Sequence, residues 1–229
     1  MTAPPPIDYK PKNDTSLKDQ IKEDLIQKYK EILKIHLDGR AFKEDKVKFW
    51  LNNILTDAKE YFIKKYPNYD IFLFTQICDG QIYYRSNSNA ILVTKTDAHD
   101  FADYKSDDFY CILRFAFMKH YNLDYNIEEY EDAIIQKGDE ILRKYLEDRK
   151  FIHENADDNN IRINDEYVNF ILEKEKYLRV YVISKIYKKP VPGKYYFKYL
   201  CHGKDIYTKI IQTYDNENLE CVHFLFFLK

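Results

Sequence analysis

The stretch Phe109–Met118, FYCILRFAFM, reads as a buried β-strand. Aromatic, aliphatic and β-branched residues fill it, Arg114 is its only charge, and it is short for an amphipathic helix. A second stretch of the same character, Leu219–Leu228 or LECVHFLFFL, lies near the end of the sequence. Cys111 and Cys221 align when the two stretches are superposed, at an offset of 110 residues. We therefore expect two similar strands, each closing one half of a duplicated chain.

A helical stretch repeats at nearly the same offset. Lys137–Leu146, KGDEILRKYL, aligns without gaps on Lys28–Leu37, KYKEILKIHL, and five of the ten positions are identical. Gly138 falls inside this stretch, where glycine costs about 1 kcal/mol relative to alanine. We therefore expect a kink or unusually tight packing at Gly138.

Hydrophobic periodicity and turn residues divide each half into helices followed by strands. In the first half we expect a helix from about Ser16 that stops at Asp38-Gly39, a helix over Glu44–Lys65, and strands over Asp70–Cys78, Gln81–Lys95, Phe101–Lys105 and Phe109–Met118. In the second half we expect a helix over Ile127–Lys150, a solvated loop over Glu154–Asn160, a short helix capped by Asn164 or Asp165, and strands over Leu178–Tyr187, Tyr195–Cys201, Ile206–Thr213 and Leu219–Leu228. Asp79-Gly80 predicts a hairpin between the first two strands. The expected fold is α+β, with two ααββββ domains at residues 16–120 and 127–229 after a flexible tail at residues 1–15.

Composition excludes several classes of function. The net charge of −2 gives no bulk attraction to nucleic acid or anionic lipid, and no apolar run approaches the ~20 residues that span a bilayer. The first residues lack the basic and apolar regions of a secretory signal. The four cysteines show no CxxC spacing, which favours buried thiols in a reducing compartment. We expect a soluble intracellular protein that binds neither nucleic acid nor membrane.

Motifs for catalysis and for metal binding are missing. The sequence has no glycine-rich phosphate loop, no GxSxG and no HExxH. Cys201 and His202 are adjacent, but neighbours along a strand point to opposite faces and cannot act as nucleophile and base. The aspartates between residues 97 and 108 lack the Gly and Glu positions of an EF-hand. We expect no catalytic residue, no cofactor and no metal, and we interpret His223 as a core or interface histidine and Arg114 as paired or facing the seam between the two domains.

Several segments, taken in order, resemble the Tctex-type dynein light chains. They are Asp38–Phe42 (DGRAF) after the first helix, Lys46–Trp50 (KVKFW) at the start of the second, Phe72–Gly80 in the first strand, the polar corner Asp97–Asp100, and the closing Phe109–Ile112 (FYCI). The resemblance covers about Ser16–His120 and returns more weakly in Tyr177–Lys189 and Glu217–Leu228. The family's tryptophan–aspartate pair late in the second strand is absent, since Trp50 is the only tryptophan.

The resemblance implies two Tctex-type domains in tandem that form a pseudo-dimer within one chain. In this family two helices pack on a four-stranded antiparallel sheet, and the second strands cross to the partner's sheet. The implied function is that of a non-catalytic adaptor in a cytoplasmic or cytoskeletal dynein complex, in a cilium or axoneme, with the dynein intermediate chain or another dynein light chain as partner. Two alternatives stay open: a scaffold or tether of the same fold on a microtubule-associated assembly outside dynein, and a small intracellular enzyme.

We place the candidate binding edge at the short strand Phe101–Lys105. An extended partner segment would add to it by main-chain hydrogen bonds. The predicted site residues are Phe101, Ala102, Asp103, Tyr104 and Lys105, with Gln81, Tyr83 and Arg85 beside them. Phe101 and Tyr104 are expected to supply pockets, and proline at Ala102 or Tyr104 to remove a donor from the edge. The tandem counterpart is Ile206–Thr213, and the alternative is that the second half covers this edge.

Overall fold

The computed structural model describes residues 14–79, 86–92, 98–119, 128–147, 153–174, 179–189, 194–203 and 206–228. The elements are, in chain order, α1 (Asp14–Leu37), α2 (Glu44–Lys65), β1 (Tyr69–Asp79), β2 (Ser86–Leu92), β3 (Ala98–Lys105), β4 (Phe109–Lys119), the 3₁₀ turn η1 (Glu128–Tyr130), α4 (Glu131–Leu146), α5 (His153–Lys174), β5 (Arg179–Lys188), β6 (Tyr195–His202), β7 (Ile206–Asp215) and β8 (Leu219–Leu228). The fold is α+β, as expected, with four α-helices and two antiparallel sheets in the described part. None of the described helices has the length and apolar character needed to cross a membrane.

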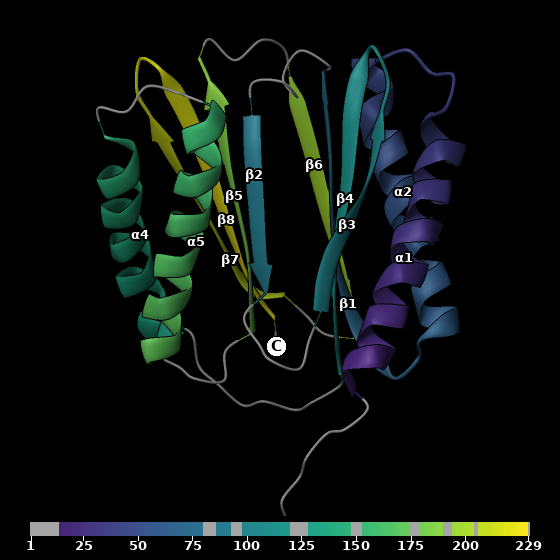
Figure 1. The fold of residues 1–229 in the computed structure, drawn as a ribbon, viewed down its shortest axis with the longest axis horizontal. Coiled ribbons are helices and arrows are strands. Elements are labelled where there is room, and N and C mark those ends of the chain that lie inside the picture. The colour runs from purple at the N-terminus through teal and green to yellow at the C-terminus, as the bar shows by residue number, and fades with distance from the viewer. Residues whose placement is uncertain are drawn as a thin grey trace, which may run out of the picture.

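Two four-stranded sheets stand face to face in the middle of the molecule, and the helices cover their outer faces (Figure 1). The first sheet has the strand order β3-β4-β1-β6 and lies under α1 and α2. The second has the order β2-β5-β8-β7 and lies under α4 and α5. The molecule therefore has four layers, with a seam between the sheets.

Each sheet contains one strand from the other half of the chain. β2 is hydrogen-bonded to β5 in the second sheet, and β6 is hydrogen-bonded to β1 in the first. The hairpin predicted at Asp79-Gly80 is therefore wrong: β1 lies between β4 and β6, and the chain leaves the first sheet after β1. Because each half completes the other's sheet, the halves cannot separate without breaking two strand pairings.

The repeat seen in the sequence is confirmed in the structure. α2 and α5 are both 22 residues long and begin 109 residues apart, at Glu44 and His153. β4 and β8 are paired in equivalent registers, with Cys111 opposite Ile77 and Cys221 opposite Ile186. The two halves are therefore copies of one arrangement of helices and strands.

The second half differs from expectation in its second helix. The solvated loop predicted at Glu154–Asn160 is wrong, and the helix predicted after it is correct but begins much earlier, because α5 runs unbroken from His153 to Lys174. Asn160 and Asn164 are fully buried on the face of α5 that also carries Ile163 and Ile171. Amide side chains at core-facing positions hide the hydrophobic spacing on which the prediction relied.

Three apolar clusters hold the layers together. The first lies between α1, α2 and the first sheet, and the second between α4, α5 and the second sheet. The predicted α2 stripe is buried in the first cluster; its residues are Val47, Trp50, Leu51, Ile54, Leu55, Ala58 and Phe62. The third cluster fills the seam and is rich in aromatic rings. For example, Phe72 of β1 lies 4.8 Å from Phe226 of β8, measured between ring centroids.

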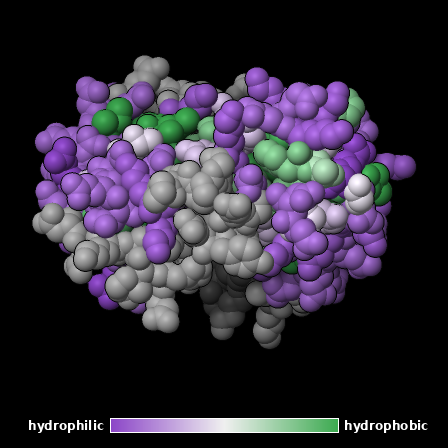
Figure 2. All heavy atoms as spheres, turned by 90° about the horizontal axis from the view of Figure 1, so that it is seen from above, coloured by the Kyte–Doolittle hydropathy of each residue, from purple (hydrophilic) through white to green (hydrophobic). Residues whose placement is uncertain are grey.

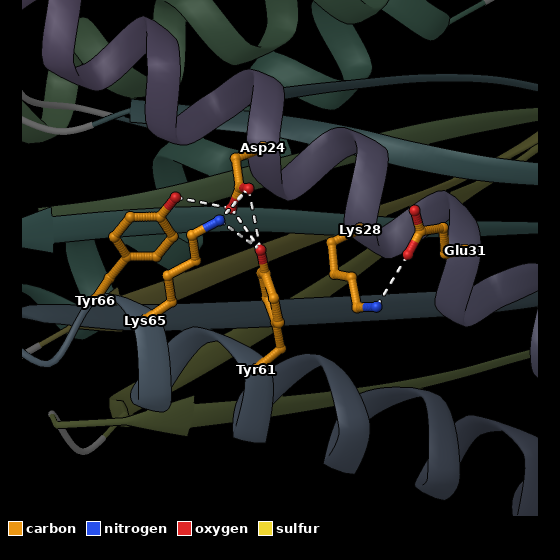
Figure 3. A network of polar contacts seen from close by, with 6 residues as sticks. All are labelled: Asp24, Lys28, Glu31, Tyr61, Lys65 and Tyr66. Atoms are coloured by element: carbon orange, nitrogen blue, oxygen red, sulfur yellow. Dashed lines mark hydrogen bonds and ion pairs between the residues drawn. The ribbon is translucent and has the colours of Figure 1, made fainter.

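A polar network joins α1 to α2 on the outside of the first half (Figure 3). The Asp24 carboxylate accepts hydrogen bonds from the hydroxyls of Tyr61 and Tyr66, at 2.8 and 2.7 Å, and from the Lys65 ammonium. Burial alone would raise the pKa of Asp24, but these hydrogen bonds outweigh it and the pKa is lowered. Because it joins the N-terminal part of α1 to the last turn of α2, the network fixes how the two helices cross.

Candidate functional site

The predicted edge strand lies at the outside of the first sheet. β3 is hydrogen-bonded to β4 on one side and has no strand on its other side among the described residues. The hairpin to β4 closes with a hydrogen bond from the Ser106 N–H to the Phe109 carbonyl. Since antiparallel ladders alternate, the backbone groups of Ala102 and Tyr104 face β4, and those of Phe101 and Asp103 face the open edge. The hydrogen bond from the Phe101 N–H to Asp100 Oδ1, at 2.9 Å, agrees with this direction.

This alternation corrects the expectation about proline. A proline at Ala102 or Tyr104 would remove a donor from the ladder to β4 and disturb the sheet itself. The donors that an added strand could use belong to the odd-numbered positions, such as Asp103. Asp103 is therefore the position at which proline tests the edge.

Side chains alternate between the two faces of β3. Ala102 is fully buried under the helices, and Tyr104 packs on the same side with its ring 5.9 Å from Phe109. The Tyr104 hydroxyl donates to Asp38 at 3.2 Å, so this ring is committed to the first core. Phe101 lies on the seam side and remains 44% exposed, with the Arg114 guanidinium 5.6 Å from its ring. Phe101 is thus the exposed aromatic ring at this edge.

The other predicted site residues are placed as follows. Lys105 is exposed at the end of β3 and Asp103 is half-buried. Gln81, Tyr83 and Arg85 lie outside the described residues.

The tandem counterpart is also an edge strand. β7 pairs only with β8 in the described part, and it begins with an irregularity between Ile206 and Thr208. Ile211 is 44% exposed at the position of β7 that corresponds to Phe101 in β3. Across the seam from Ile211, Phe197 of β6 is also partly exposed, and its ring packs 4.9 Å from Phe224. Apolar side chains therefore reach the surface at both outer edges.

The seam also contains charged side chains. Arg114 of β4 and Lys185 of β5 are buried in it, and burial lowers the pKa of Lys185 to about 8. The Lys185 ammonium lies 5.2 Å from the Tyr187 ring, and this tyrosine hydroxyl accepts a 3.1 Å hydrogen bond from Gln76. The surroundings of this tyrosine are also aromatic, because the Tyr187 ring stacks on Tyr195 of β6 at 4.9 Å. The expectation that Arg114 faces the seam is confirmed. The burial of Lys185 was not predicted, because nothing in the sequence around it distinguishes it from an exposed lysine of a strand.

Polar side chains also lie deep in the second core. His223 is fully buried on β8, with its ring stacked 4.2 Å from that of Tyr167. Neither ring nitrogen has a hydrogen-bond partner among the described residues, and burial lowers the pKa of His223 to about 3. The equivalent position in the first half is Leu113. The interpretation of His223 as a core histidine is confirmed.

The buried His223 predicts how stability depends on pH. Its pKa is about 3 in the folded chain and about 6.5 when unfolded, so the unfolded chain binds one more proton between these values. The free energy of unfolding should therefore fall by about 1.4 kcal/mol for each pH unit below 6.5 through this residue alone. Urea unfolding at pH 7, 6, 5 and 4 should show a smaller slope for His223→Leu than for the parent. Equal slopes for the two proteins would show that His223 does not cause the pH dependence of the free energy of unfolding.

Cys201 packs in the seam, and His202, as its neighbour along β6, belongs to the opposite face. All four cysteines are free thiols. Among the described residues no group of three His, Cys, Asp or Glu side chains is placed to hold a metal ion.

No protein-family model matches the chain, and no curated protein matches it significantly.

Proposed function

We propose that this chain is a non-catalytic adaptor of the Tctex type, which holds an extended segment of a partner protein at the open edge of β3. The observation that carries the proposal is the exchange of β2 and β6 between two face-to-face sheets, in which β3 pairs with a described strand on one side only, as do β6, β2 and β7. An open edge offers unpaired main-chain donors and acceptors to an incoming strand. The resemblance names the dynein intermediate chain as the partner, in a ciliary or axonemal complex.

The side chains at the edge fit an extended ligand. Phe101 is exposed on the seam side, next to the buried Arg114, and can contact alternate side chains of an added strand. Tyr104 is held in the core and would act by fixing β3 in place. Asp100 occupies the Phe101 N–H, so a partner strand must displace this local hydrogen bond.

Asp103→Pro tests the edge directly. It should weaken capture of the dynein intermediate chain by about tenfold, because it removes one outward main-chain donor and obstructs the approach of a strand. Asp103→Ala is the matched control, since it removes the same side chain and keeps the donor. The measurement is a pull-down from native extract, followed by affinity measurement with the captured segment.

The other outcomes are distinct. If Asp103→Pro folds and captures the partner like the parent while Thr213→Pro does not, the partner uses the equivalent β7 edge. If neither proline changes capture, strand addition at these edges is wrong. Capture of a different microtubule-associated subunit in place of the intermediate chain would favour the scaffold alternative.

A further inference from the structure

A hollow of about 730 Å³ opens at the end of the molecule where α1 is joined to α2. It is lined by the connecting loop and the first two turns of α2, at Gly39, Arg40, Ala41, Lys43, Asp45, Lys46, Phe49 and Trp50. Its volume is within the range of small-ligand sites. Figure 2 looks onto this end and shows, on the side of the first half, an apolar patch surrounded by hydrophilic side chains.

The walls of the hollow combine cations with aromatic rings. The Arg40 guanidinium lies 5.8 Å from the centre of the Trp50 ring, which leaves the donors on its edge available. Phe49 is 58% exposed, which is unusual for a phenylalanine on a helix. Beneath them the Trp50 ring stacks on Phe109 at 5.9 Å, so the floor is rigid.

The charge of the hollow is positive although the chain is slightly acidic overall. Its three cations, Arg40, Lys43 and Lys46, stand against one carboxylate, Asp45, which forms an exposed 3.5 Å pair with Lys46. The neighbouring Glu44 is held away by two hydrogen bonds from Lys194, at 2.7 and 2.9 Å. No side chain caps the first turn of α2, so the positive end of the helix dipole adds to this field.

The repeated fold does not require this chemistry. At the equivalent positions of the second half, 109 residues on, Lys46 is replaced by Asn155, Phe49 by Asp158 and Trp50 by Asn159. Arg40 corresponds to Arg149 and Lys43 to Ile152, so the exposed Phe49 ring and two of the three cations, Lys43 and Lys46, are particular to the first half.

We propose that this hollow binds an acidic protein segment in which a carboxylate stands next to an aromatic or other large apolar side chain. Arg40 and Lys43 bind the carboxylates, since guanidinium and ammonium groups give charge-assisted hydrogen bonds. Phe49 covers the apolar side chain, and the Trp50 ring forms the floor beneath it. This site lies on the first helix pair and is separate from the β3 edge, so either can exist without the other.

Trp50 is the only tryptophan in the chain and lines the hollow, so its fluorescence reports occupation directly. The probe is the acetylated and amidated tripeptide Glu-Phe-Glu, with the neutral Gln-Phe-Gln as its control. We expect a saturable change in Trp50 emission with a dissociation constant below about 1 mM, and binding of the neutral peptide at least about fivefold weaker. Raising NaCl from about 50 to 500 mM should weaken binding of the acidic peptide severalfold.

Arg40→Gln and Lys43→Gln should each weaken binding of the acidic peptide by about threefold to tenfold. Lys64→Gln, an exposed lysine of the same helix away from the hollow, is the matched control and should bind like the parent. Urea unfolding of Arg40→Gln checks that the variant is folded, and Lys43→Gln gives the same test at a residue without a ring contact. The assignment is overturned if both peptides act alike, if neither substitution changes binding, or if inorganic phosphate alone gives the same response as the acidic peptide.

Discussion

Trp50→Ala should lower the free energy of unfolding by about 3–5 kcal/mol, a large part of the stability of a domain. The Trp50 side chain is only 3% exposed and stacks on Phe109 in the first core. Its loss leaves a cavity between α2 and the first sheet and also removes the surface on which the Arg40 guanidinium rests. The measurement is urea unfolding followed by circular dichroism, because the variant has no tryptophan fluorescence.

Phe49→Ala is the matched control for Trp50→Ala. Phe49 is the preceding residue, is also aromatic, and is 58% exposed, so its removal should change the free energy of unfolding by less than about 0.5 kcal/mol. A Trp50→Ala variant that unfolds at the same urea concentration as Phe49→Ala would show that Trp50 does not belong to the core. The pair also separates the two roles of this region, since both residues line the hollow but only Trp50 supports the fold.

The sequence predicts α2 and the closing strands because their patterns are strong and local. α2 has the predicted bounds Glu44–Lys65, and its apolar stripe is the face that is buried. β4 and β8 read as buried strands because both of their faces are covered, one by helices and one by the opposite sheet. Where burial follows hydrophobicity, the sequence is sufficient.

Other features could not be predicted from local patterns. The sequence of a strand does not specify which sheet it joins, so the placement of β2 beside β5 could not be predicted from the residues. The N-terminal half of α5 was missed because Asn160 and Asn164 occupy core positions that are normally apolar. At the β3 edge, the direction of the backbone donors depends on the register with β4, which only the structure gives.

Each helix pair contains one buried tyrosine, which comes from the first helix, α1, in the first half and from the second helix, α5, in the second half. In the first half Tyr29 of α1 reaches α2, and its hydroxyl donates to the Ala58 carbonyl at 3.4 Å. In the second half the residue equivalent to Tyr29 is Gly138, and the residue equivalent to Ala58 is Tyr167. Tyr167 then reaches back across α4 and bonds to Gln212 of β7. The expectation of tight packing at Gly138 is confirmed, and its cause is the Tyr167 ring.

Gly138→Ala should therefore destabilise the chain by about 2–3 kcal/mol, even though alanine favours a helix by about 1 kcal/mol. A Cβ at this position would overlap the Tyr167 hydroxyl and lie 2.6 Å from Cζ of the same ring. The ring cannot swing away because it is fully buried and stacked on His223. Gln212 cannot yield easily either, since its amide donates to the Ile135 carbonyl and to Asp139, at 2.8 and 2.9 Å.

A double-mutant cycle with Tyr167→Leu isolates this cause. Leucine keeps an apolar side chain in the core but removes the hydroxyl and the far end of the ring, so Gly138→Ala in that background should be neutral or stabilising by up to about 1 kcal/mol. The coupling energy from four urea unfolding curves should then be at least about 2 kcal/mol. If the changes in the free energy of unfolding caused by the two substitutions add to within about 0.5 kcal/mol, Gly138 is not required to make room for the Tyr167 ring. If Gly138→Ala destabilises the parent but stabilises the Tyr167→Leu variant, the glycine is needed to make room for the tyrosine. The second half then places its tyrosine where the first half has Ala58, and its glycine where the first half has Tyr29.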